Sequence, residues 1–64
     1  MKELLKDYLE KDRIYSYKDV NIIACKIDGH ICHVAFDFED YGNRRERELP
    51  INIWEVLAFL NYIR

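Results

Sequence analysis

The sequence predicts a single small α+β domain in which two helices and a three-stranded antiparallel meander follow in the order α-β-β-β-α, with both helices on one face of the sheet. Two alternating, β-branched-rich runs lie within Val20–Phe38 and are separated by Asp28-Gly29. An amphipathic stretch precedes them, and a more apolar one closes the chain. We expect one domain over residues 1–64, because 64 residues lie near the lower size limit for folding on a hydrophobic core alone.

The first predicted helix covers Lys2–Asp12. At about 100° per residue, its apolar stripe consists of Leu4, Leu5, Tyr8 and Leu9, and charged residues occupy the remaining positions. A helix of this length is marginal in isolation, so it needs a surface to pack on. We expect it to lie at the flank of the sheet, with the second helix at the centre.

Val20–Phe38 predicts a β-hairpin, because Asp-Gly between alternating apolar runs suits a type I′ turn. With Asp28 and Gly29 as the turn, Cys25 faces Cys32, and Ile23 faces Val34. Alternation then gives a core face that holds Ile23, Cys25, Ile27, Cys32, Val34, Phe36 and Phe38. The other face holds Val20, Ile22, Ala24, Lys26, Ile31, His33, Ala35 and Asp37. Of these, Val20, Ile22 and Ile31 are candidates for contact with a partner.

Residues 13–19 admit two interpretations. They could form a short extended segment that carries Tyr15 and Tyr17 into the hairpin, or a single helical turn capped by Ser16. Beyond a turn predicted over residues 39–43, the alternating charges of Asn43–Leu49 predict a polar third strand at an edge of the sheet.

The second helix is predicted over residues 53–64, with Asn52 as its N-cap and Glu55 in the position of a capping-box partner. Its broad apolar face contains Ile53, Val56, Leu57, Phe59, Leu60 and Ile63. Trp54, Ala58 and Tyr62, spaced by four, form a second stripe on the opposite side. Either the first helix or the 14–17 segment covers this stripe, or it contacts a partner.

Composition and charge exclude several classes of protein. A net charge of −2 argues against strong general affinity for nucleic acid or anionic membranes. The N-terminal stretch lacks an apolar signal region, and no apolar run is long enough to span a bilayer. We therefore expect a cytoplasmic protein whose two cysteines are reduced.

Neither a metal site nor a catalytic site is expected. Cys25, His30, Cys32 and His33 have metal-ligating side chains, but their spacing differs from the Cys-x-x-Cys element of zinc sites. Small buried thiols without metal or cofactor are the expectation. Catalysis would need Ser16 or a cysteine beside a histidine, with a third group to orient the pair, and the sequence offers none.

The basic residues concentrate in Arg44, Arg45 and Arg47. The stretch Arg45–Pro50 resembles the basic strand of ribbon-helix-helix repressors, which precedes a helix. The predicted element order is similar to that of double-stranded-RNA-binding domains, yet Pro50–Trp54 lacks the lysines with which that family holds phosphates at its second helix. No RNA-binding residues carry over. Because Glu46 and Glu48 alternate with the arginines, cross-strand ion pairs are the simpler interpretation.

These observations favour a small non-enzymatic protein-binding domain that occupies a surface of another protein or of a second copy. Trp54, Ala58 and Tyr62 are the first candidates for contact residues, because Trp and Tyr are enriched at interface anchors. Inhibitors and adaptors, including those encoded by bacteriophages, are often domains of this kind. The alternative is a nucleic-acid-binding regulator that uses Arg44, Arg45 and Arg47.

Overall fold

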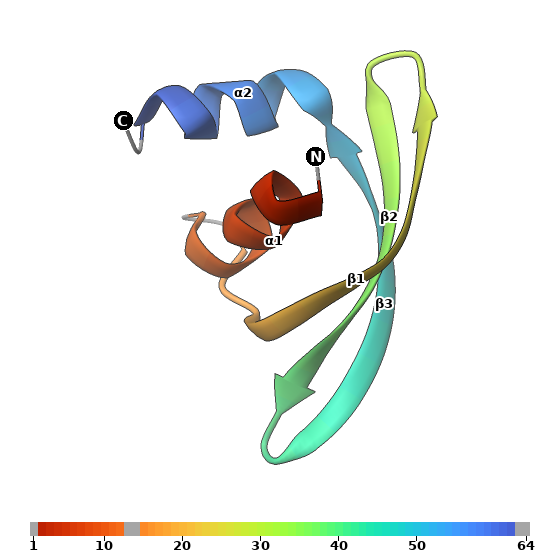
Figure 1. Cartoon of the computed structure of the whole chain (residues 1–64), viewed down its shortest axis with the longest axis vertical. Coiled ribbons are helices and arrows are strands. Elements are labelled where there is room, and N and C mark those ends of the chain that lie inside the picture. The colour runs from red at the N-terminus through yellow and green to blue at the C-terminus, as the bar shows by residue number, and fades with distance from the viewer. Residues whose placement is uncertain (1, 13–14, 63–64) are drawn as a thin grey trace.

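The computed structural model describes residues 2–12 and 15–62 of the chain. Five elements follow one another: α1 (Lys2–Lys11), β1 (Lys18–Asp28), β2 (Ile31–Asp40), β3 (Asn43–Asn52) and α2 (Ile53–Tyr62). The strands form one antiparallel sheet in the order β1-β2-β3, which confirms the predicted α-β-β-β-α order and the meander. Figure 1 shows the sheet as a curved layer, with both helices on the same side of it.

The first hairpin turns one residue later than predicted. Asp28 pairs with Ile31, so Gly29 and His30 form the turn, and Gly29 has a φ of 63°. Glycine at the first central position suits a type II′ turn, which needs positive φ there. Cys25 therefore pairs with Val34. The predicted register, with Cys25 opposite Cys32, is wrong.

A β-bulge in β1 also changes which side chains face the core. Ile22 pairs with Phe36 and Ala24 with Ala35, so Ile23 is the extra residue between them. An inserted residue reverses the alternation of faces along a strand. Val20 is consequently only 2% exposed and Ile22 packs on the core, whereas Ile23 is 45% exposed. The predicted assignment of Val20, Ile22 and Ile23 to faces is therefore wrong.

On β2 the predicted core face is confirmed. Cys32, Val34 and Phe36 are buried, and Phe38 packs against them. Ile27 lies on their side of the sheet by register, opposite Cys32, yet it is 56% exposed near the hairpin tip. Ile31 lies on the other face and is half-buried.

The core lies between α1 and the sheet. From α1 it includes Leu5, Tyr8 and Leu9, as the predicted stripe requires, and from α2 only Val56 and Phe59. The complete set of buried residues is Leu5, Tyr8, Leu9, Val20, Cys32, Val34, Phe36, Ile51, Val56 and Phe59. The expectation that the second helix takes the centre of the sheet is therefore wrong. In Figure 1, α1 lies in the hollow of the sheet and α2 extends beyond it.

Two polar contacts attach α1 to the start of β1 and to the residue before it. The backbone N–H of Val20 donates to Glu10 Oε2 at 2.9 Å, and the N–H of Tyr17 donates to the carbonyl of Leu9 at 3.1 Å. The Glu10 carboxylate also accepts from Lys6 Nζ at 2.7 Å. These bonds satisfy backbone groups near the chain reversal after α1.

The described part of the connector, residues 15–17, is not helical, which favours the extended interpretation. Its tyrosines continue a series of ring contacts across the molecule. Tyr15 lies 5.7 Å from Tyr8 between ring centroids, and Tyr17 lies 4.6 Å from Phe38. Arg13 and Ile14 lie outside the described residues.

Helix α2 begins where predicted. Asn52 Oδ1 accepts the backbone N–H of Trp54 at 2.9 Å, the bond expected of an N-cap. The N–H of Ile53 donates to the carbonyl of His30 at 2.8 Å, so the hairpin tip also holds the start of the helix. Because β3 runs directly into α2, no loop is available to fold the helix back over the sheet. Ile63 and Arg64 lie outside the described residues.

The burial of Phe59 predicts a large destabilisation on truncation. Phe59→Ala should lower the free energy of unfolding by about 3–5 kcal/mol, because it removes a core ring and leaves a cavity. Leu57→Ala, at an exposed position of the same helix, is the matched control and should have a much smaller effect. Urea unfolding measures both. Equal destabilisation by the two changes would contradict the orientation of α2.

Candidate binding surface

The outer face of α2 is the most exposed apolar surface on the helices. Trp54 is 68% and Tyr62 79% exposed, and Ala58 between them is also exposed. The sequence left open whether this stripe is covered by α1 and the connector or is available to a partner. Among the described residues, neither α1 nor residues 15–17 cover it. We refer to Trp54, Ala58 and Tyr62 as the α2 stripe.

Charge is scarce around the α2 stripe. The exposed residues of α2 are Trp54, Glu55, Leu57, Ala58, Asn61 and Tyr62, and Glu55 alone among them is charged. On α1 the exposed positions are Lys2, Glu3 and Lys11, all charged. A solvated helix face normally resembles that of α1. The outer face of α2 instead has the composition of an interface core, in which charged residues are depleted and aromatic ones enriched.

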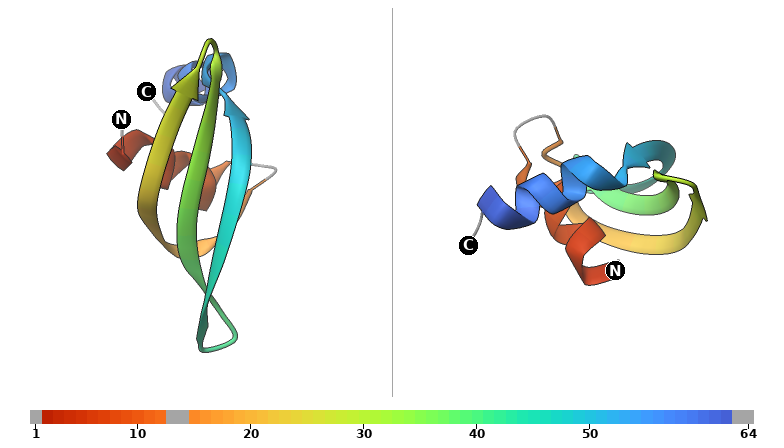
Figure 2. Two further views of the ribbon diagram at one scale, coloured as in Figure 1. Left: turned by 90° about the vertical axis from the view of Figure 1, so that its right-hand side faces the viewer. Right: turned by 90° about the horizontal axis from the view of Figure 1, so that it is seen from above.

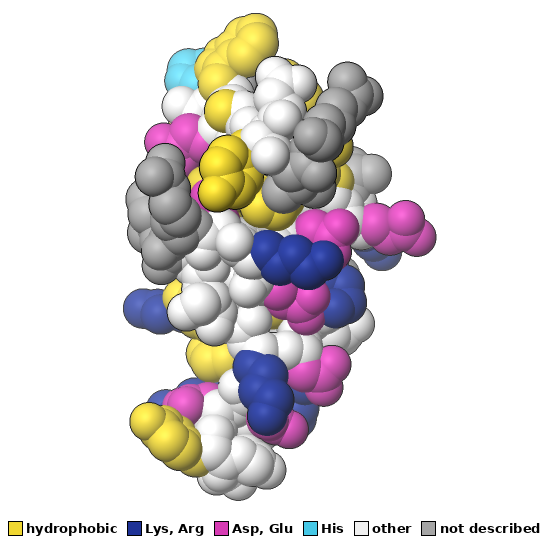
Figure 3. All heavy atoms as spheres, turned by 90° about the vertical axis from the view of Figure 1, so that its left-hand side faces the viewer, with side chains coloured by type: hydrophobic (Ala, Val, Ile, Leu, Met, Phe, Trp, Pro, Cys, Tyr) yellow, Lys and Arg dark blue, Asp and Glu magenta, His cyan; other side chains and the backbone are white. Residues whose placement is uncertain are grey.

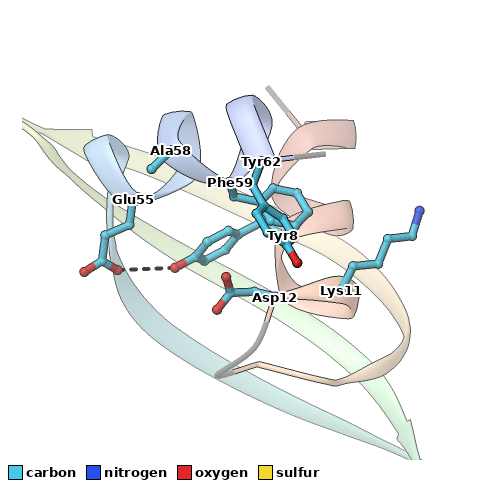
Figure 4. Close-up of a pocket in the computed structure, with 7 residues that line it drawn as sticks. All are labelled: Tyr8, Lys11, Asp12, Glu55, Ala58, Phe59 and Tyr62. Carbon is cyan, nitrogen blue, oxygen red and sulfur yellow. Dashed lines mark hydrogen bonds between the residues drawn. The ribbon is translucent and has the colours of Figure 1, made fainter. Parts of the chain in front are cut away.

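A groove lies beside the stripe, between the two helices (Figure 4). Its volume is about 340 Å³. The lining residues come from α1, from the position after it and from α2: Tyr8, Lys11, Asp12, Glu55, Ala58, Phe59 and Tyr62. Ala58 and Tyr62 thus belong to both the stripe and the groove, which makes one continuous surface. A volume of this size accommodates one or two side chains of a partner.

Tyr8 forms the link across this groove. Its hydroxyl donates to Glu55 Oε2 at 3.2 Å, and its ring meets Phe59 edge-on with centroids 5.5 Å apart (Figure 4). Burial, and then the neighbouring carboxylates of Asp12 and Glu55, raise the pKa of Tyr8 well above its ordinary value. Tyr8 therefore stays a neutral donor at physiological pH. Glu55, predicted as a capping-box partner, contacts α1 instead.

The sequence predicted the stripe but not the groove. Helical periodicity predicts Tyr8 on the apolar stripe of α1 and gives no role to Lys11 or Asp12. No sequence signal marks these residues, because the groove exists only through the packing angle of α1 and α2. The other predicted contact residues lie elsewhere: Val20 is buried, Ile22 packs on the core, and Ile31 lies half-buried on the opposite face of the sheet.

The arginines of β3 are engaged within the chain. Arg44 forms ion pairs with Asp19, at 2.9 Å, and with Asp37. Arg45 Nε lies 2.7 Å from Asp40 Oδ2. These contacts agree with the ion-paired edge strand inferred from the alternating charges, and the hydrogen bond from Arg44 lowers the pKa of the Asp37 carboxyl.

Register further separates the arginines between the two faces of the sheet. Arg47 pairs with Phe36 and Arg45 with Phe38, on the core side, so Arg44, the neighbour of Arg45 along the strand, faces the other way. Arg47 also donates to Tyr17 Oη at 2.8 Å. In Figure 3, basic and acidic side chains alternate over the face that is shown, without a continuous basic patch.

The two cysteines are joined by a disulfide, with their Cα atoms 6.3 Å apart. They are diagonal neighbours on β1 and β2, since Cys25 pairs with Val34 and Cys32 with Ile27. The expectation of free thiols is therefore wrong for this structure. Cytoplasmic location stays a prediction, and in a reducing cytosol such a bond would be unusual. No group of metal-ligating side chains occurs among the described residues.

Comparisons with known proteins give no assignment. No protein-family model matches the chain, and neither a curated protein nor a solved structure matches it. Among the described residues, no helix is both long enough and apolar enough to cross a membrane.

The raised pKa of Tyr8 predicts a loss of stability at alkaline pH. Because the pKa in the folded state lies above the unfolded value of about 10, this contribution is complete below that pH and is lost as pH rises, when the unfolded chain ionises first. Urea midpoints between neutral pH and about pH 11 should fall less steeply for Tyr8→Phe than for the wild type.

Tyr62→Phe is the matched control for this measurement, because the Tyr62 ring is exposed. It should keep the wild-type slope. If Tyr8→Phe kept that slope as well, the assignment of Tyr8 as a buried neutral donor would be contradicted.

Proposed function

We propose that this chain is a non-enzymatic protein-binding domain that presents the outer face of α2 to another protein surface. The observation that carries the proposal is the exposure of Trp54 and Tyr62, at 68% and 79%, on a helix whose other side is fixed in the core. Aromatic anchors of this kind supply much of the binding energy in protein interfaces.

Folding gives no reason for the stripe to be aromatic. The buried set from Leu5 to Phe59 forms a continuous core without any residue of the stripe. In a domain of this size, large aromatic side chains in water contribute little to stability and increase the tendency to associate. A binding role accounts for them directly.

The groove supports the same proposal, because it offers both apolar and polar contacts. Ala58 and the ring of Tyr62 provide exposed apolar surface above the buried rings of Tyr8 and Phe59, and the carboxylates of Asp12 and Glu55 lie beside them. An apolar side chain from a partner could enter between the helices while its backbone or neighbouring donors contact the carboxylates. Binding of a helical or extended segment in a groove of this kind is a common recognition mode.

The absence of enzymatic activity is part of the proposal. Ser16 lies in the connector before β1, whereas His30 and His33 lie at the far end of the hairpin beyond it, so the length of β1 separates the hydroxyl from both imidazoles. A nucleophile and its base must lie within hydrogen-bond reach. Occupying a partner's surface, as inhibitors and adaptors do (bacteriophage proteins among them), needs no such pair.

A displayed-peptide selection tests the proposal. A random peptide library on phage is selected against the immobilised chain, and the enriched peptides are titrated against variants by fluorescence polarisation. Trp54→Ala combined with Tyr62→Ala should weaken binding at least ~30-fold, the equivalent of about 2 kcal/mol, without lowering the melting temperature appreciably.

The matched control for this titration is Ile23→Ala combined with Ile27→Ala, which removes two exposed aliphatic side chains from the hairpin and should leave binding unchanged. Peptides that bind the Trp54/Tyr62 variant as tightly as the wild type would refute the proposal. The nucleic-acid alternative would instead be favoured by binding of a nucleic acid that falls steeply with salt and depends on Arg44, Arg45 or Arg47.

A further inference from the structure

We propose that the α2 stripe binds a second copy of this chain, through an antiparallel α2–α2 contact with Ala58 on the two-fold axis. The inference rests on the proposed function, because it names the occupant of the same surface. Viewed from above in Figure 2, α2 lies across the top of the molecule with α1 beneath it. The helix is therefore presented in a position where a second one can approach.

The spacing of the stripe is self-complementary. Trp54 and Tyr62 each lie four residues from Ala58. In an antiparallel pair centred on Ala58, Trp54 of each copy is therefore level with Tyr62 of the other. A two-fold interface requires such a patch, since the same residues must meet their counterparts in reverse order. Alanine at the centre allows a close approach of the helix axes, and the aromatic residues on either side can pack as offset or edge-on pairs.

Charge gives an independent argument for a second copy. Glu55 and Asn61 each lie three residues from Ala58, so the same symmetry places the single charged group of the exposed face level with an amide. No like charges oppose each other, because the Glu55 carboxylates of the two copies lie at opposite ends of the contact. Residues 53–62 contain no Lys or Arg, and the described cation nearest to the stripe is Lys11 on the α1 side of the groove.

The groove extends the contact beyond α2. Tyr62 lines the groove at one end of the helix, and Glu55 lines it near the other. Symmetry brings Tyr62 of the second copy to the Glu55 end, where its ring can cover the groove and its hydroxyl can donate to the carboxylate. Two short helices still give an interface at the small end of the known range, so we expect a weak, reversible dimer.

Charge variants at Ala58 test this arrangement, because residue 58 meets residue 58 on the axis. Sedimentation velocity of the wild type should show a mass that rises with concentration towards that of a dimer. Ala58→Glu alone and Ala58→Lys alone should each weaken dimerisation at least tenfold, since like charges meet at the axis. An equimolar mixture of the two variants should dimerise again, and added salt should weaken that mixed dimer.

Ile27→Glu and Ile27→Lys provide the matched control, because they place the same charges at an exposed position outside α2. They should dimerise as the wild type does. Circular dichroism verifies that each Ala58 variant keeps its helices. If an Ala58 variant loses its helices, the double variant Trp54→Ala with Tyr62→Ala is measured in its place. That double variant must be monomeric.

Three outcomes would overturn the inference: a wild type that stays monomeric, an Ala58→Glu variant that still dimerises, or a mixture that remains monomeric. These results are separable from the test of the proposed function. A monomeric wild type that still binds selected peptides through Trp54 and Tyr62 would remove the second copy as partner and leave the binding surface in place.

Discussion

The position of α2 depends on one buried side chain, Tyr8. The N-cap Asn52 is also the last residue of β3, so α2 leaves the end of the sheet and cannot lie over its centre, which α1 occupies. Tyr8 connects the two helices: its ring contacts Phe59, and its hydroxyl reaches Glu55. On the other side the same ring contacts Tyr15, which begins the series of aromatic contacts toward the sheet. Both the angle between the helices and the groove between them follow from this contact.

This arrangement has a direct consequence for the surface of the molecule. Because only Val56 and Phe59 of α2 are buried, most of the helix remains accessible. On a helix that served stability alone, we would expect charged residues at the outer positions, as on α1. Trp54, Ala58 and Tyr62 occupy them instead. Because β3 runs directly into α2 and α1 occupies the centre of the sheet, α2 lies off the sheet. Its aromatic outer face is therefore available for association, as the proposed function requires.

The sequence was sufficient for the elements and for the stripe, but not for the strand register. Helical periodicity identified Leu5, Tyr8 and Leu9, and the preference of Asn for N-caps identified Asn52, because both signals are local. Within residues 21–36, the predicted register is wrong for two local reasons. Gly29-His30 formed the turn in place of Asp28-Gly29, and the bulge at Ile23 exchanged the faces of the residues before it. The later turn keeps the same residues on each face, so alternation alone does not select it. The bulge reverses the alternation and depends instead on packing against α1, which buries Val20. The groove could not be predicted for the same reason.

The fluorescence of Trp54, the single tryptophan of the chain, tests most directly whether the outer face of α2 is free in the monomer. The measurement is acrylamide quenching of the native chain in dilute solution, compared with the chain unfolded in urea. Our account predicts that the native indole emits at the wavelength of a water-exposed ring and is quenched nearly as efficiently as in the unfolded chain. A blue-shifted emission that is shielded from acrylamide, in a sample shown to be monomeric, would mean that Trp54 is part of the core and would contradict the account.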